Sequence, residues 1–167
     1  MVKERDQAIQ KIVRSKTRGE TKAERKRLKI IVGEAFDYAA FSQLSLGRRD
    51  WEKRTKVEKL EFIDLNRRLI ERNYADPKLY KKADKIEYLG LEIDGINFVV
   101  KTVVHYKSEK SSIDYKLHQL AEEWLIYDMI IDDLSLSKSN RAQFRREIRK
   151  SSYEGLLLKL KGKLEDL

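Results

Sequence analysis

The stretch Ile113–Phe144, IDYKLHQLAEEWLIYDMIIDDLSLSKSNRAQF, decides the fold because it contains two strand patterns joined by a short turn. In the first pattern, IDYKLH, apolar and polar residues alternate, which is typical of a strand with one buried face. The second pattern, WLIYDMII, is apolar on both faces except for Asp128, which predicts a central, well-covered strand. The polar residues 137–140 then predict the start of a helix. The rest of the chain should pair with this hairpin or cover it.

Residues 89–105 predict a second hairpin. Apolar residues alternate with polar ones in LGLEI, and Asp94-Gly95 is a strong signal for a two-residue turn. The following segment, NFVVKTVVH, has Phe98 and Val100 on one face and Lys101 and His105 on the other. Together the two hairpins predict an antiparallel sheet of about four strands.

Helical patterns are found both before and after the predicted strands in the sequence. Asp37 can cap a short helix, YAAFSQLSL, which Gly47 would close. Thr55 with Glu58 has the spacing of a capping box and opens a long helix that reaches about Tyr74. Two C-terminal helices follow, the second opened by a capping box of Ser151 with Glu154. The fold class is α+β, in one domain (1–167), with an N-terminal helix (1–20) whose docking the sequence leaves open.

The composition restricts the possible partners. Net charge is +9, so an anionic partner such as nucleic acid or an acidic membrane surface is compatible with the chain. The basic residues are scattered and interleaved with acids, whereas a nucleic-acid binder concentrates them on one face beside exposed aromatics. The absence of cysteine excludes disulfides and thiol chemistry. The first 16 residues lack the apolar core of a signal peptide, which leaves either a cytosolic protein or a mature exported form.

Candidate catalytic groups are sparse. His105 and His118 both fall on the polar faces of strands, where a solvated histidine is the ordinary explanation. Asp128 is more simply explained as a buried carboxylate, hydrogen-bonded to backbone or paired with an arginine, than as a general base. No phosphate-binding loop, dinucleotide turn or metal-ligand set is recognisable. We therefore expect neither an enzyme nor a metal or cofactor site.

The long helix 55–74 is apolar over more than half of its circumference. Such a helix is covered from more than one side, or it lines a space that a ligand fills. The pattern alone does not choose between a solid core and a cavity.

Two blocks of the sequence resemble the MlaC, or toluene-tolerance, family of phospholipid-binding proteins. FDYAAFSQLSLGRRDW (36–51) followed by TKVEKLEFIDLNRRLIERNY (55–74) is similar to the family's opening block. The motif Trp-x-x-Tyr-Asp at 124–128, with RAQFRREI and EGLLLKL after it, is similar to its closing half. The similarity in order and spacing runs from about Phe36 to Leu160.

The resemblance implies a periplasmic, monomeric carrier with no cofactor and with phospholipid as its cargo. Members shuttle phospholipid between an outer-membrane lipoprotein complex and an inner-membrane ABC transporter that has an MCE-domain component, and so maintain outer-membrane lipid asymmetry. The implied fold is a small antiparallel sheet wrapped by N- and C-terminal helices. Its NTF2-like cavity would hold acyl chains between sheet and helices, which makes the chain a single lipid-binding domain.

By position, the resemblance implies twelve residues as candidate lining of the acyl-chain pocket: Tyr38, Phe41, Leu44, Phe62, Leu69, Val100, Tyr115, Leu117, Tyr127, Met129, Leu136 and Phe144. Two other hypotheses stay open. One is a basic NTF2-like module with a solid core that contacts nucleic acid or an acidic protein. The other is a small enzyme that uses Asp128 and a tyrosine in the same cavity.

Overall fold

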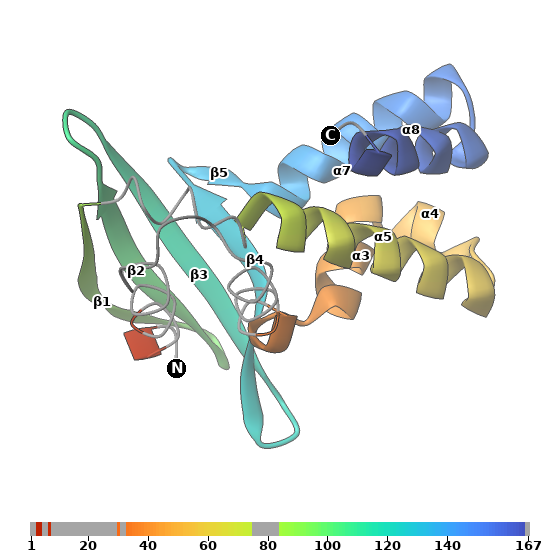
Figure 1. The fold of residues 1–167 in the computed structure, drawn as a ribbon. Coiled ribbons are helices and arrows are strands. Elements are labelled where there is room, and N and C mark those ends of the chain that lie inside the picture. The colour runs from red at the N-terminus through yellow and green to blue at the C-terminus, as the bar shows by residue number, and fades with distance from the viewer. Residues whose placement is uncertain (1–2, 5–6, 8–29, 31–32, 75–83, 166–167) are drawn as a thin grey trace.

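The structure is a computed structural model that describes residues 3, 4, 7, 30, 33–74 and 84–165. The predicted N-terminal helix (1–20) therefore lies almost entirely outside the described residues. Within them the architecture is α+β, as predicted, and comprises a five-stranded sheet and a group of helices (Figure 1).

The sheet has the order β1-β2-β3-β4-β5, and all neighbours are antiparallel. The strands are β1 (Lys85–Asp94), β2 (Asn97–His105), β3 (Lys110–Leu120), β4 (Glu123–Ile131) and β5 (Leu134–Ser135). The four long strands confirm the two predicted hairpins, including the turn after Asp94. The fifth strand has only two residues and pairs with the end of β4.

Strand register gives the sheet one apolar and one charged face. The pairs Phe98–Leu117, Val100–Tyr115 and Tyr115–Met129 stand side by side across β2, β3 and β4, on the apolar face. This register confirms the predicted alternation on β2 and β3. On β1 a bulge between Tyr88 and Gly90 interrupts it, and the side chains of Leu89, Leu91 and Ile93 are exposed. A shift between Lys116 and Leu117 marks a β-bulge in the β3–β4 pair, so the alternation along β4 is interrupted there.

Ion pairs connect the strands on the charged face. Lys101 Nζ lies 3.1 Å from a Glu92 carboxylate oxygen, and Lys116 Nζ lies 3.4 Å from Asp94. The two carboxylates are more than half exposed and the two lysines are partly exposed, so each pair adds little to stability.

The outer edge of β4 is covered by other parts of the chain. β5 pairs with its last residues, and Phe36 forms a parallel bridge with Ile126. The Asp37 N–H donates a hydrogen bond of 2.9 Å to the Ile126 carbonyl. The segment before the first well-described helix is therefore fixed to the sheet.

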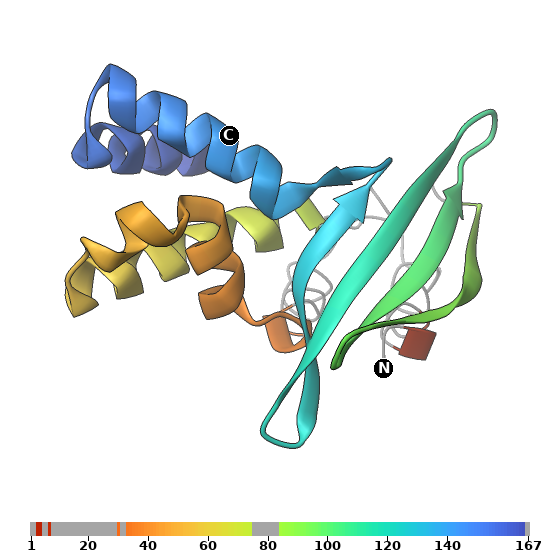
Figure 2. The same ribbon diagram turned by 180° about the vertical axis from the view of Figure 1, so that it is seen from behind.

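The helices lie on the β4 and β5 side of the sheet, away from β1 and β2 (Figures 1 and 2). They are α3 (Tyr38–Leu46), α4 (Arg48–Glu52), α5 (Lys56–Tyr74), α7 (Leu136–Lys150) and α8 (Tyr153–Glu165). α3 and α7 both contact β4, whereas α8 packs on α5 and α7. α3 and α7 thus connect the sheet to the other helices.

Two of the predicted helix starts are confirmed. Asp37 Oδ1 accepts a hydrogen bond from the Ala40 N–H at 2.9 Å, which caps α3. Thr55 and Glu58 bond reciprocally, at 2.7 Å and 3.2 Å, in a capping box before α5. Gly47 ends α3 with a φ of +85°, in the left-handed region that favours glycine.

The predicted capping box of Ser151 with Glu154 is wrong. Ser152 provides the cap instead, because its hydroxyl accepts a hydrogen bond of 3.0 Å from the Gly155 N–H. Ser151 belongs to the preceding turn, where its hydroxyl donates to the Glu147 carbonyl at the end of α7. Only Ser151 has a glutamate three residues later, but the end of α7 engages Ser151, so Ser152 caps α8 without a capping box.

The buried apolar residues form two groups. The helical cluster lies among α3, α5, α7 and α8 and comprises Leu46, Phe62, Leu65, Phe144, Tyr153, Leu156 and Leu160. The sheet cluster lies between the apolar face of the sheet and the helices and comprises Ala35, Phe36, Phe41, Ile70, Leu117, Ile126 and Met129. α3 and α5 contribute residues to both clusters.

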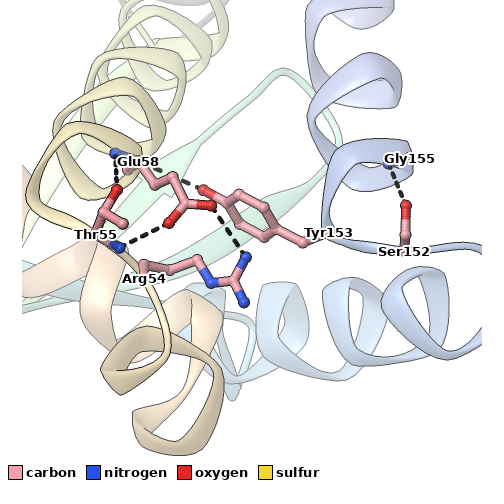
Figure 3. Close-up of polar contacts among 6 residues, drawn as sticks. All are labelled: Arg54, Thr55, Glu58, Ser152, Tyr153 and Gly155. Carbon is pink, nitrogen blue, oxygen red and sulfur yellow. Dashed lines mark hydrogen bonds and ion pairs between the residues drawn. The ribbon is translucent and has the colours of Figure 1, made fainter.

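A polar contact set fastens the start of α8 to the start of α5 (Figure 3). The Arg54 guanidinium lies over the Tyr153 ring, 4.2 Å from its centre. The Tyr153 hydroxyl donates to the Glu58 carbonyl at 3.4 Å, and Arg54 pairs with the Glu58 carboxylate at 3.3 Å. These contacts close the helical cluster at the end furthest from the sheet.

Candidate functional site

A pocket of about 100 Å³ lies where the helical cluster meets the sheet cluster. Its apolar walls include Phe41 and Ile70 from the sheet cluster and Phe144 and Leu160 from the helical cluster. The complete lining is Phe41, Asn66, Leu69, Ile70, Asn73, Tyr74, Leu136, Asn140, Phe144, Leu160 and Lys163. The pocket is thus a gap between helices α3, α5, α7 and α8, and no strand residue lines it.

Helical spacing explains why these residues meet. On α5 the lining residues follow one strip, at i, i+3, i+4, i+7 and i+8 from Asn66. On α7 they recur every four residues, from Leu136 to Phe144, and on α8 they are three apart. Each helix therefore turns a single face toward the pocket.

The pocket has a polar edge. Asn66 is only 2% exposed, and its amide donates to the Phe62 carbonyl at 3.0 Å. Asn140 is half-buried, whereas Asn73 and Lys163 are exposed. The pocket could hold an elongated apolar group with its polar end beside these amides and the ammonium group.

The volume limits what fits without movement. Sites for drug-sized molecules usually measure about 300–1,000 Å³. At about 100 Å³ the pocket admits a slender apolar group, and a larger ligand would require the helices to separate.

The structure brings four of the twelve predicted site residues into this pocket: Phe41, Leu69, Leu136 and Phe144. Five others lie in or against the sheet cluster: Tyr38, Val100, Tyr115, Leu117 and Met129. Phe62 is 0% exposed, at the centre of the helical cluster.

The remaining two predicted residues lie elsewhere. Leu44 is 37% exposed on α3, and it lines neither the pocket nor a cluster. The Tyr127 ring lies 4.9 Å from the His118 ring and 5.7 Å from Lys116 Nζ, so it belongs to the charged face of the sheet. Regular alternation would put Tyr127 beside Met129, but the bulge between Lys116 and Leu117 moves it to the other side.

Sequence reasoning missed seven lining residues: Asn66, Ile70, Asn73, Tyr74, Asn140, Leu160 and Lys163. The apolar ones belong to apolar helix faces, and such a face is explained by packing in a solid core as well as by the lining of a pocket. The asparagines carried a usable signal, because Asn66 and Asn73 interrupt the apolar face of α5 two turns apart.

Asp128 is a structural residue, as its simpler interpretation predicted. The carboxylate is buried and accepts four hydrogen bonds: from the Met129 N–H (2.9 Å), the Ser137 N–H (3.0 Å) and the hydroxyls of Ser135 (2.7 Å) and Ser137 (2.8 Å). It also lies at the amino end of α7, where the helix dipole stabilises a negative charge. These contacts attach the start of α7 to β4.

Both histidines pair with carboxylates on the charged face. His105 Nε2 lies 2.9 Å from Glu87, and His118 Nε2 lies 2.9 Å from Asp37. Asp37 thus uses one oxygen to cap α3 and the other to contact β3. Among the described residues, no three histidine, aspartate or glutamate side chains gather as a metal site would require.

Tyr38 is an exception to the rule that buried polar groups are paired. Its ring stacks on Phe36 with centres 5.6 Å apart, and its hydroxyl is buried without a hydrogen-bond partner in the described part of the chain. Burial, together with the nearby Glu71 charge, raises the pKa of Tyr38 well above its usual range. The hydroxyl therefore stays neutral, within the wall of the sheet cluster.

The fold is that of a known class of protein. It is similar to a phospholipid-binding protein from Ralstonia solanacearum, solved in complex with a phospholipid at 1.53 Å resolution. The TM-score is 0.80 at 21% sequence identity, with 98% of this chain and 94% of the other covered. The sequence model described as MlaC protein matches residues 3–162. The chain therefore belongs to the MlaC family.

Two further findings concern curated proteins and the length of the helices. No curated protein matches it significantly. Of the helices that the structure describes, none is both long enough and apolar enough to cross a bilayer.

Proposed function

We propose that this protein is a phospholipid carrier that holds acyl chains at the junction of its two clusters. One observation carries the proposal: four helices turn apolar side chains into a pocket that has a polar edge. Membership of the MlaC family and the fold shared with a phospholipid-binding protein support it. The protein acts as a monomer in the periplasm and needs neither cofactor nor catalytic group.

The finer proposal concerns transport. The protein receives phospholipid from one membrane complex and delivers it to another, between an outer-membrane lipoprotein complex and an inner-membrane ABC transporter with an MCE component. This exchange maintains the lipid asymmetry of the outer membrane. The resemblance of the two sequence blocks supports this role.

The energetics suit a carrier. Moving an acyl chain out of water yields about 0.8 kcal/mol per CH₂, and a bilayer offers the chain nearly the same gain. Transfer between bilayer and protein is therefore close to balanced and requires no covalent chemistry. The helices must separate for the chains to enter, since the closed pocket measures about 100 Å³.

The proposed lining extends beyond the pocket. The twelve residues predicted from the resemblance remain the starting set, and Ile70, Tyr74 and Leu160 join them from the pocket walls. Val100 and Tyr115 are half-buried beside the sheet cluster and would meet a chain that passes between sheet and helices. Leu44 and Tyr127 are the weakest members of the set, because neither lines the pocket.

Native mass spectrometry of the purified protein, followed by organic extraction, tests the proposal. We expect a co-purifying phospholipid in a one-to-one ratio. A protein of apo mass that takes up no lipid from vesicles would contradict the carrier function and favour a binding module with a solid core.

Leu69→Asp places a charge in the pocket wall and should abolish lipid retention, because an unpaired charge is very costly among acyl chains. Leu60→Asp is the matched control, since Leu60 lies on the same helix and is 58% exposed. Asn140→Trp offers a second route, as it fills the pocket from a half-buried position without burying a charge. Circular dichroism confirms that each variant is folded. A folded variant of either kind that retains lipid like the control would refute the assignment of this pocket.

A further inference from the structure

The polar edge of the pocket contains one lysine, Lys163, that forms no ion pair with another residue of the described part of the chain. α8 carries lysines at 159, 161 and 163, two of which are engaged: Lys159 Nζ lies 2.7 Å from Glu147, and Lys161 Nζ lies 2.7 Å from Glu61. Lys163 lines the pocket, and within the described residues it has no acidic partner. Its ammonium group can therefore bind an anion at the pocket without breaking an existing ion pair.

Asparagine amides surround the same pocket. Asn66 and Asn73 come from α5 and Asn140 from α7. The Asn66 amide is buried and already donates to the Phe62 carbonyl, whereas Asn140 is half-buried and Asn73 is exposed. Asn140 and Asn73 can therefore turn their amides toward a polar part of a ligand at this edge.

We propose that Lys163, assisted by Asn140 and Asn73, binds the phosphate of the phospholipid. This inference rests on the proposed function and adds the position of the headgroup. An ammonium group and neutral amides can all donate to phosphate oxygens, and charge-assisted bonds of this kind are the stronger ones. The acyl chains then run from this edge toward Phe41 and Ile70, where the lining is apolar.

The proposal implies selection by phosphate alone. A phosphate group is common to all phospholipids, so lipids with different headgroups should bind alike. A neutral diacylglycerol with the same chains lacks the phosphate and should bind less well. Lys163 would thus determine which lipid class the carrier accepts.

Competition between two lipids tests this. Delipidated protein is incubated with vesicles that contain phosphatidylcholine and diacylglycerol with identical chains, then re-isolated, and the bound lipids are extracted and quantified. Lys163→Met should lower the ratio of bound phospholipid to diacylglycerol about fivefold, a modest factor because the lysine is partly solvated. Lys163→Arg should keep most of the preference. Lys161→Met removes the same charge from α8 outside the pocket and should leave the ratio unchanged.

The outcomes separate this proposal from the proposed function. Wild-type protein that takes up lipid, with an unchanged ratio in Lys163→Met, would overturn the headgroup site and leave the carrier function standing. An equal loss in Lys161→Met would also overturn it, because general charge would then explain the effect. Wild-type protein that takes up neither lipid would overturn both.

Two further ligands identify the source of the anion. Inorganic phosphate alone should not displace bound lipid, since it lacks the acyl chains. Displacement by phosphate would assign Lys163 to a free-phosphate site. Oleate that outcompetes phosphatidylcholine would assign it to a carboxylate, and either result would overturn the proposal.

Discussion

The helical cluster and the sheet cluster are built from similar amounts of apolar side chain but differ in their borders. In the helical cluster Phe62 packs edge-on against Phe144, with ring centres 5.8 Å apart, and the half-buried neighbours are mostly aliphatic. The half-buried neighbours of the sheet cluster are mainly aromatic residues with polar tips: Tyr38, Tyr74, Tyr88, Tyr115 and Trp124. Such side chains accept apolar contact and a polar environment alike. We therefore expect the helical cluster to contribute more to the stability of the fold. The border of the sheet cluster can be in contact with either water or an apolar ligand.

The largest expected difference concerns stability. Phe62→Ala should lower the free energy of unfolding by about 3–5 kcal/mol, because it empties the centre of a closed core. Val100→Ala should cost about 1 kcal/mol, since the side chain is only half-buried beside the sheet cluster. Urea unfolding measures both. Equal losses would mean that the two clusters support the fold equally.

A pH-dependent difference is expected at Tyr153, in the helical cluster. Burial and the nearby Glu58 charge raise the pKa of this phenol from 10.0 to about 12. The unfolded chain releases the proton at a lower pH than the folded protein, so stability is fully present below pH 10 and falls as the pH rises toward about 12.

Tyr153→Phe should remove this part of the alkaline loss. The free energy of unfolding is compared for both proteins at about pH 9 and about pH 11, where other titrating groups contribute equally to both. Parallel losses in the two proteins would show that the Tyr153 proton is not linked to folding.

The smallest expected effect is a gain in stability, and it concerns Tyr38 beside the sheet cluster. Tyr38→Phe removes a buried hydroxyl that has no hydrogen-bond partner among the described residues. The lipid-free protein should become more stable by up to about 1 kcal/mol, because an unpaired buried polar group is unfavourable. Thermal unfolding measures the change. A clear loss of stability would mean that the hydroxyl is paired in solution.

Local patterns predicted much of the fold, and long-range contacts explain what they missed. The alternation in the 113–118 strand, the cap at Asp37 and the capping box at Thr55 each depend on residues close in sequence. The bulge that turns Tyr127 to the charged face depends on how β3 and β4 pair, which alternation cannot reveal.

The pocket was harder to predict for the same reason. It joins α5 to α8, which lie roughly 90 residues apart in sequence, so no local pattern contains it. Phe62 and Phe144 have the same chemistry, yet only Phe144 lines the pocket. Apolar periodicity distinguishes a buried face from an exposed one, and it does not distinguish a solid core from a cavity wall.

Two carboxylates determine which walls of the pocket are fixed. Asp37 joins the start of α3 to His118 on β3, and Asp128 joins the start of α7 to β4 through Ser135 and Ser137. α3 and α7 therefore behave as extensions of the sheet.

α8 is held differently, because among the described residues no buried carboxylate bonds it to the sheet. Its lysines 159 and 161 form exposed ion pairs, which are worth about 0–1 kcal/mol each and break easily. Its first residue, Tyr153, is fastened to α5 by the Arg54 and Glu58 contacts. Leu156 and Leu160 hold the middle of α8 by burial in the helical cluster. α3 and α7 are thus bonded to the sheet, whereas the α8 wall of the pocket is held to α5 and α7 by apolar packing and by the contacts at Tyr153.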